Sequence, residues 1–403
     1  MIQRELYLER IRPFIGREPV KVLTGFRRSG KSVLLELIKE ELKRGGVPDE
    51  NIISFNFEQM RNAVFCTALS LHDELVKRTE ALTGKVYFFF DEIQEVAEWE
   101  KCVNSCRVDF DCDIYITGSN AKLLSGELAT FLGGRYVEFV VYPFSFAEYL
   151  LATRGTAADG NAEAFREYLA VGGMPFLSQL SGDKASAELY LRDLFSSAVL
   201  KDVVRRNNIR DVDLLERIIA YALANIGHTF SATSIARYLK NEKRSVSHET
   251  ILNYIKACCD AFLFYRISRE DLPGKKLLSV NEKYYVADHG LRAAVYGKTN
   301  QDIDQLLENV VCLELLRRDY RVTIGKIGER EIDFVAEKNG EKLYVQVAYL
   351  LATEEVVRRE FDILEEIPDN YPKYVVSMDE FDMSRNGIKH RNVRDFLLAK
   401  EWN

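Results

Sequence analysis

The residues best suited to chemistry lie between positions 25 and 32, in the order Gly25-Phe26-Arg27-Arg28-Ser29-Gly30-Lys31-Ser32. Glycines at both ends of this pattern let the backbone turn tightly, so that consecutive N–H groups and the start of the following helix face an anion. Lys31 is expected to reach the β- and γ-phosphates of a nucleoside triphosphate, and Ser32 to bind Mg²⁺. Nucleotide contacts are therefore expected from Gly25, Arg28, Ser29, Gly30, Lys31 and Ser32. The alternative is a glycine turn with an unrelated lysine.

Two acids, Asp91 and Glu92, follow the apolar run Val86-Tyr87-Phe88-Phe89-Phe90. On a buried strand beside the phosphate-binding loop of residues 25–32 (the P-loop), Asp91 would hold Mg²⁺ through water, and Glu92 would orient and polarise an attacking water. The pair favours a hydrolase over a nucleotide kinase, because a kinase needs no water activator. The alternative is an ordinary acidic turn at the end of a strand.

A third group of polar residues follows the strand expected at Ile114-Tyr115-Ile116. Ser119 or Asn120 is a candidate sensor of the γ-phosphate, although a plain strand-end turn explains the asparagine nearly as well. Arg135 comes directly after a glycine pair. In a neighbouring subunit it would neutralise charge in the transition state, and the alternative is an ion pair with a local carboxylate.

The elements that must position these residues follow from the spacing of apolar runs. Strand-like runs alternate with helical stretches over the first 150 residues, which predicts a parallel sheet covered by helices. The pattern from about 151 to 265 is helical. Beyond about residue 299, helices at 303–318 and 354–366 alternate with strands, the last at 374–376, which predicts a second α/β module.

The bulk composition narrows the classes of protein. The chain has 403 residues, of which 47% are hydrophobic and 29% charged, and no apolar stretch approaches the roughly 20 residues that span a bilayer. We expect a cytoplasmic protein that does not contact membranes. A net charge of −7 argues against indiscriminate coating of nucleic acid. The seven cysteines lack metal-site spacing and are expected to be reduced thiols.

These motifs together resemble a known family. Gly25 to Ser32, the Asp91-Glu92 pair, Thr117-Gly118-Ser119-Asn120, Gly134-Arg135 and the segment Tyr142 to Tyr149 are similar to prokaryotic AAA-type P-loop ATPases of the AAA+ superfamily. In that family a domain of unknown function, of the DUF-4143 type, follows the ATPase module. The resemblance implies ATP and Mg²⁺ as cofactors, ATP hydrolysis, and a homo-oligomer in which Arg135 acts in trans as an arginine finger.

The middle of the chain has the element order of a winged helix. Helices are expected at 214–226, 231–239 and 247–262, followed by strands at 263–267 and 283–286. The basic residues near the start of the third helix are Lys240, Lys243, Arg244 and Lys256, with His248 among them. A reader of double-stranded DNA would place basic residues there, but a winged helix that only contacts protein explains them as well.

The C-terminal region resembles the PD-(D/E)XK nuclease fold. Glu308 on a helix, Asp333 on a strand and Gln346 on the next strand match the metal-binding positions. The position of the catalytic lysine is occupied by Ala348. We therefore expect an inactive module that binds DNA or is structural, unless Lys342 or Lys373 reaches the site.

The sequence thus predicts an α/β P-loop NTPase, with a parallel sheet and flanking helices, followed by a winged-helix module and a small nuclease-like α/β module. The expected boundaries are 1–150 for the ATPase domain, 151–210 for a helical linker or lid, 211–298 for the winged helix and 299–403 for the nuclease-like domain. The favoured function is an ATP-driven switch or motor acting on DNA or a DNA-associated partner. The alternatives are an ATP-gated metal-dependent nuclease and a non-catalytic nucleotide-binding scaffold.

Overall fold

A computed structural model describes residues 2–121, 133–157, 160–180, 183–241, 246–272, 274, 276–297 and 302–402, with only the backbone for 276–281. The chain divides into two compact units. Unit 1 contains Met1–Tyr142 and Asp260–Phe262, and unit 2 contains Pro143–Cys259 and Leu263–Asn403. Among the described helices, none is long and apolar enough to cross a membrane.

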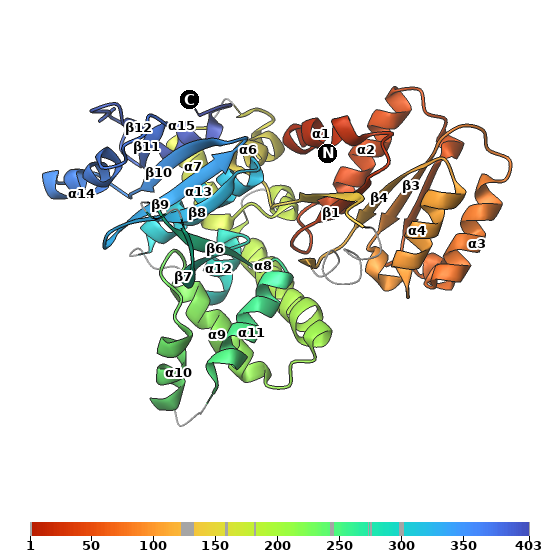
Figure 1. The fold of residues 1–403 in the computed structure, drawn as a ribbon, viewed down its shortest axis with the longest axis horizontal. Helices are drawn as coiled ribbons and strands as arrows, with labels where there is room; N and C mark the ends of the chain where they lie inside the picture. Colours follow the sequence, from red (N-terminus) through yellow and green to blue (C-terminus); the bar gives the residue numbers. More distant parts are fainter. Residues whose placement is uncertain are drawn as a thin grey trace. The chain divides into compact units, whose positions relative to one another are not determined.

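Unit 1 is built on a sheet of five parallel strands in the order β2-β3-β4-β1-β5 (Figure 1). The strands are β1 (Val20–Thr24), β2 (Ile52–Asn56), β3 (Val86–Asp91), β4 (Cys112–Thr117) and β5 (Tyr136–Val140). The expected parallel sheet is therefore confirmed. Its central strands are mostly apolar and are buried, as parallel strands normally are, and Lys21 of β1 forms a buried ion pair with Asp113 of β4.

Helices cover both faces of this sheet. They are α1 (Glu5–Ile11), α2 (Lys31–Arg44), α3 (Ala68–Thr79) and α4 (Trp99–Asp109). Side chains of α1 and α2 share one apolar core with Leu23 and Tyr115. Those of α3 and α4 share another with Val22 and Ile116. Because β-strand side chains alternate between faces, neighbouring residues of one strand contribute to opposite cores.

Unit 2 begins with helices. These are α6 (Phe146–Arg154), α7 (Ala162–Val171), α8 (Lys184–Ala198), α9 (Val212–Ala224), α10 (Ala232–Asn241) and α11 (His248–Asp260). The first of them starts at a capping box, in which the Ser145 hydroxyl accepts the Glu148 N–H and the Glu148 carboxylate accepts the Ser145 N–H. The helical middle region expected from the sequence is confirmed.

A mixed sheet of seven strands completes unit 2, in the order β12-β11-β10-β9-β8-β6-β7. The strands are β6 (Phe264–Asp271), β7 (Lys276–Val286), β8 (Arg321–Ile327), β9 (Arg330–Lys338), β10 (Glu341–Val347), β11 (Lys373–Ser377) and β12 (Lys389–Asn392). Its helices are α12 (His289–Tyr296), α13 (Ile303–Arg317), α14 (Glu354–Glu365) and α15 (Val393–Leu398).

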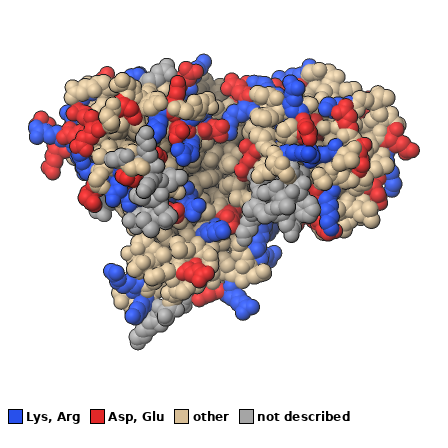
Figure 2. Space-filling view, viewed as in Figure 1, with Lys and Arg blue, Asp and Glu red and all other residues tan. Residues whose placement is uncertain are grey.

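Two features of this sheet were not foreseen from the sequence pattern. The β6–β7 hairpin pairs with β8, so the sheet continues across the boundary expected between residues 298 and 299. The strand at Lys373–Ser377 is not the last, because β12 and α15 follow it. Figure 2 shows Lys and Arg side chains interspersed with Asp and Glu on the visible face, in keeping with the modest net charge.

Candidate nucleotide-binding site

The loop between β1 and α2 requires glycine at both ends. Gly25 has φ +135°, and a Cβ there would lie 2.3 Å from the carbonyl oxygen of Val141. Gly30 has φ +103° and is the residue before the first turn of α2. Arg28 also lies in the left-handed region, with φ +61°. These backbone conformations turn the loop around the N-terminus of a 14-residue helix, where N–H groups favour an anion.

The side chains of this loop suit a triphosphate. Lys31 is buried, and its ammonium donates to the carbonyl oxygens of Gly25 at 3.0 Å and Phe26 at 3.1 Å. Its side chain therefore folds back against the start of the same loop. Within the described part of the chain, the buried hydroxyl oxygen of Ser29 has no hydrogen-bond partner. An unsatisfied buried hydroxyl and a buried lysine whose ammonium donates to carbonyl oxygens of the loop both fit a site for a polyanion.

A residue without an assigned role in the sequence supports the loop from behind. Arg4 is 1% exposed, and its guanidinium donates to the carbonyl oxygens of Ser29 at 2.9 Å and Tyr142 at 2.8 Å. It also lies 4.5 Å from the centre of the Tyr7 ring. Its position 25 residues before Ser29 leaves no local pattern by which the contact could be predicted.

Asp91 ends β3 in the middle of a hydrogen-bond network. Its carboxylate accepts from the Thr117 hydroxyl at 2.6 Å and from the Asn56 amide at 2.8 Å, and the Ser32 hydroxyl also bonds to it. Burial raises the pKa of Asp91, and the bonds from Thr117 and Ser32 oppose that rise. The two predicted magnesium ligands, Ser32 and Asp91, are thus in contact. Asn56 and Thr117, which the sequence left without a role, orient the carboxylate.

Glu92 is held beside Asp91 in an unusual backbone conformation. Its φ is +55°, and its N–H donates to the Thr117 hydroxyl at 2.8 Å. Its carboxylate accepts from the Gln94 amide, and the Ser119 hydroxyl lies 3.5 Å from Oε2. A non-glycine residue in the left-handed region is uncommon and needs support of this kind. Thr117 therefore positions both acids.

The strand of Asp91 is not paired with the strand that leads into the P-loop. β4 pairs with β1 on one side and β3 on the other, so it separates them. Because all strands are parallel, the ends of β1, β4 and β3 still meet at one edge of the sheet. Ser119 and Asn120 follow β4 at this edge, between the P-loop and the acids, and both are buried.

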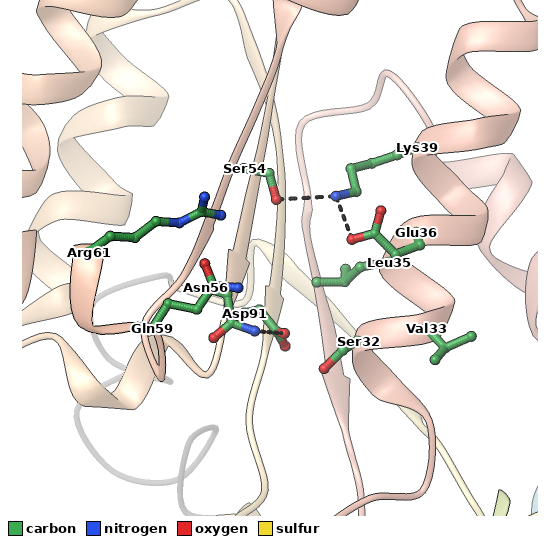
Figure 3. A pocket seen from close by; sticks show the side chains of 10 residues that line it. All are labelled: Ser32, Val33, Leu35, Glu36, Lys39, Ser54, Asn56, Gln59, Arg61 and Asp91. Carbon is green, nitrogen blue, oxygen red and sulfur yellow. Dashed lines mark hydrogen bonds and ion pairs between the residues drawn. The ribbon is translucent and has the colours of Figure 1, made fainter. Parts of the chain in front are cut away.

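A pocket of about 330 Å³ lies between α2 and β2, and Asp91 is one of the residues that line it (Figure 3). Polar side chains line most of it: Ser32, Glu36, Lys39, Ser54, Asn56, Gln59, Arg61 and Asp91, with Val33 and Leu35. Lys39 donates to Glu36 at 2.6 Å and to Ser54 at 3.3 Å. The pocket gives solutes a path to the side chains of Ser32 and Asp91.

Arg135 lies away from this edge. It directly precedes β5, and its carbonyl oxygen accepts the N–H of Val20, at the end of β1 opposite the loop. Its exposed guanidinium is 3.9 Å from the carboxylate of Glu18. Since β1 is five residues long and each strand residue adds about 3.3 Å, Arg135 cannot serve the site of its own chain.

In unit 2 the structure brings together Glu308, Asp333 and Gln346. The Gln346 side-chain oxygen accepts the Asp333 N–H at 3.2 Å. The ammonium of Lys283, from β7, lies 4.0 Å from Glu308 and 4.0 Å from Asp333. The sequence did not single out Lys283, because no pattern links β7 to β9.

Neither lysine named from the sequence reaches this cluster. Lys342 lies 3.6 Å from Glu270, and Lys373 donates to the carbonyl oxygens of Ile367 and Asp369. Ala348 is 5% exposed and packs in an apolar core. Of the basic residues expected at a DNA-reading helix, Lys240 lies in α10, and His248 and Lys256 in α11. Lys243 and Arg244 lie outside the described residues.

Comparisons with solved structures give weak likenesses. The Orc1 protein of Aeropyrum pernix, solved in complex with DNA, is 13% identical, with a TM-score of 0.31 over 73% of this chain and 92% of that one. Cdc6p of Pyrobaculum aerophilum is 12% identical, with a TM-score of 0.30 over 76% and 93% of the two chains. These scores are too low to support an argument about fold or function.

Sequence comparisons are more informative. Residues 17–150 match the family described as AAA domain, and residues 162–302 match a domain of unknown function, DUF8612, rather than the expected DUF-4143 type. An uncharacterized protein of Haemophilus influenzae is 39% identical over 99% of both chains. The uncharacterized protein MJ1544 of Methanocaldococcus jannaschii is 30% identical over 82% of this chain and 75% of its own. The chain therefore belongs to the family of these relatives, and its P-loop lies in an AAA domain.

Proposed function

We propose that the protein binds ATP and Mg²⁺ at the P-loop, hydrolyses ATP, and uses the cycle to switch or move its second unit. The observation that carries the proposal is the contact network at the sheet edge. Ser32 bonds to Asp91, and the single hydroxyl of Thr117 bonds to both Asp91 and the backbone of Glu92. A nucleotide-binding scaffold without turnover would need no second acid held in a left-handed conformation.

Each residue then has a role in hydrolysis. Lys31 would leave the carbonyl oxygens of its own loop and bind the β- and γ-phosphates. Ser32 and Asp91 would hold Mg²⁺, which would offset charge on the phosphate oxygens. Glu92 would accept a hydrogen bond from the attacking water and orient it. Ser119, 3.5 Å from Glu92, and the neighbouring Asn120 are the candidates to sense the γ-phosphate.

Arg135 would complete the site of a neighbouring subunit in a homo-oligomer. It is 64% exposed, and its contact with Glu18 is long and solvent-accessible, so little free energy opposes its release. An arginine supplied in trans stabilises transition-state charge and contributes on the order of 10³ to 10⁵ in rate in other phosphoryl-transfer systems.

The proposed partner of unit 2 is double-stranded DNA or a DNA-associated protein. Helices α9, α10 and α11 are followed by the β6–β7 hairpin, and Thr229 forms a bridge to Lys283 in β7. This order supports a winged helix over 211–298, after a linker over 151–210 and before a nuclease-like region over 299–403. Lys240 and Lys256 would contribute phosphate contacts, which makes salt-dependent binding the expectation.

The nuclease alternative has less support. It requires a divalent metal and a lysine near the attacked phosphate, and Ala348 occupies the position of that lysine in an apolar core.

The deciding experiment is steady-state ATP turnover with and without a double-stranded DNA fragment, with Glu92→Gln as the control. We expect turnover by the wild type, stimulation by DNA, and loss of turnover in Glu92→Gln with nucleotide affinity retained. Lys31→Ala should lose affinity as well. Equal hydrolysis by wild type and Glu92→Gln would remove Glu92 from the mechanism, and tight binding without turnover in the wild type would favour the scaffold.

A further inference from the structure

The carboxylates of the nuclease-like cluster surround a buried lysine. The side chain of Lys283 is 7% exposed, and its ammonium lies 3.5 Å from Glu331, 4.0 Å from Glu308 and 4.0 Å from Asp333. These acids come from two separate elements, α13 and β9. A single positive group lies between the helix acid and the strand acid, which is where a metal that bridges them would have to bind.

The charges of the acids around this lysine are partly compensated without a metal. Arg269 bonds to one oxygen of Glu331, and Lys283 lies nearest the other. Two cations therefore face the three carboxylates of Glu308, Glu331 and Asp333. Burial alone would lower the pKa of Lys283, but these carboxylates outweigh burial and raise it, so the ammonium stays charged.

Other groups of the protein also bond to the cluster acids. Asp333 accepts the N–H of Val347 at 2.8 Å, and Glu308 accepts the hydroxyl of Tyr285 at 3.0 Å. The backbone after α9 covers Glu308: a Cβ on Gly227 would lie 2.5 Å from its Oε2. A hard divalent cation needs about six oxygen ligands, several of them water, and with the ammonium of Lys283 in place the cluster has no room for them.

We infer that the ammonium of Lys283 takes the place of the divalent metal in the nuclease-like cluster, so that the cluster is a permanent ion-pair junction between β7 and the α13–β9 pair. The residues present do not fit a metal. The junction fastens the β6–β7 hairpin to the rest of the seven-stranded sheet, and it is independent of the P-loop chemistry proposed above. A strand of the proposed winged helix thereby moves together with the nuclease-like region.

The experiment is a metal rescue of stability, measured as the thermal midpoint with and without 1 mM Mn²⁺. All variants carry Asp91→Asn, which removes the P-loop magnesium ligand. We expect Lys283→Ala to lower the midpoint by about 5–10 °C, because the acids lose their counter-ion, and Mn²⁺ to restore part of the loss. The rescue should disappear when Asp333→Asn is added. Lys283→Arg, which keeps the charge, should need no rescue.

Two results would overturn the inference. One is a folded Lys283→Ala protein whose midpoint Mn²⁺ does not change. The other is an effect of Mn²⁺ on the protein that retains Lys283, either a higher thermal midpoint or nicking of plasmid DNA, that Asp333→Asn abolishes. If Lys283→Ala and Lys283→Gln both fail to fold, the test uses only the protein that retains Lys283. The absence of an Asp333-dependent response to Mn²⁺ then supports the inference, and the presence of such a response refutes it.

Discussion

Thr117→Val tests whether one hydroxyl positions both acids of the proposed ATPase site. Valine has nearly the same shape as threonine but no hydroxyl, so the change deletes two hydrogen bonds and little volume. The Thr117 hydroxyl donates to Asp91 at 2.6 Å and accepts the Glu92 N–H at 2.8 Å. Thr117 is fully buried, so water cannot replace the lost bonds.

The magnitude follows from what is left unsatisfied. A buried donor or acceptor without a partner costs about 1–3 kcal/mol, and here one amide and one carboxylate oxygen are affected. The added methyl of valine offsets part of this, so the free energy of unfolding should fall by about 2–4 kcal/mol. Without its support, Glu92 should leave the left-handed conformation. Because a displacement of about 1 Å can reduce a rate 100-fold, kcat should fall by about 10- to 100-fold.

The assay is ATP turnover at saturating ATP over a range of Mg²⁺ concentrations, with circular dichroism to confirm folding. Thr117→Ser is the matched control, because it keeps the hydroxyl and loses only a methyl. We expect Thr117→Ser to stay within a few-fold of the wild type, and Thr117→Val to need more Mg²⁺ and to turn over slowly. A folded Thr117→Val protein with wild-type kcat and Mg²⁺ dependence would refute the assigned role.

Three further predictions follow from other contacts. Gly25→Ala should abolish nucleotide binding in a filter or fluorescence assay, because the new Cβ would lie 2.3 Å from the Val141 carbonyl oxygen and the backbone has a φ of +135°. Retained affinity would contradict the requirement for glycine at this position. Arg135→Ala mixed with Glu92→Gln should recover some turnover in shared oligomers, and none if Arg135 does not act in trans. Burial lowers the pKa of His390, so on acidification the unfolded chain binds a proton at this residue before the folded chain does. The free energy of unfolding should therefore be unaffected above about pH 6.5 and fall below it. Thermal denaturation should show a steeper fall in the wild type than in His390→Gln.

Much of the fold could be predicted from local patterns. The apolar runs of the first 150 residues correspond to β1 to β5, and the helices expected at 303–318 and 354–366 correspond to α13 and α14. The strand β12 could not be predicted, because Lys389–Asn392 is entirely polar. It is ordered by pairing with β11 and by the buried His390, whose ring bonds to the Ser377 hydroxyl at 2.9 Å. That pairing is a tertiary contact, which no period in the sequence reveals.

The residues of the candidate site also fall into those that a local pattern predicts and those that it does not. Gly25, Lys31 and Ser32 were predictable because a P-loop is contiguous, and its backbone chemistry depends on residue types at fixed spacing. Asn56, Thr117 and Arg4 were not assigned, because each acts on a residue 25 or more positions away. Each of these supporting contacts exists only when separate strands end at the same edge of a sheet or a helix packs behind the loop.

The sequence by itself determined the phosphate-binding loop, the acidic pair after β3 and the parallel arrangement of the first sheet, because glycine conformations, charge and apolar periodicity are local properties. Only the tertiary structure decided that β4 lies between β1 and β3 and that Lys283 lies among Glu308, Glu331 and Asp333. Strand order and the meeting of charges depend on which distant surfaces bury their apolar area together, and the chain encodes that choice in packing rather than in any short motif.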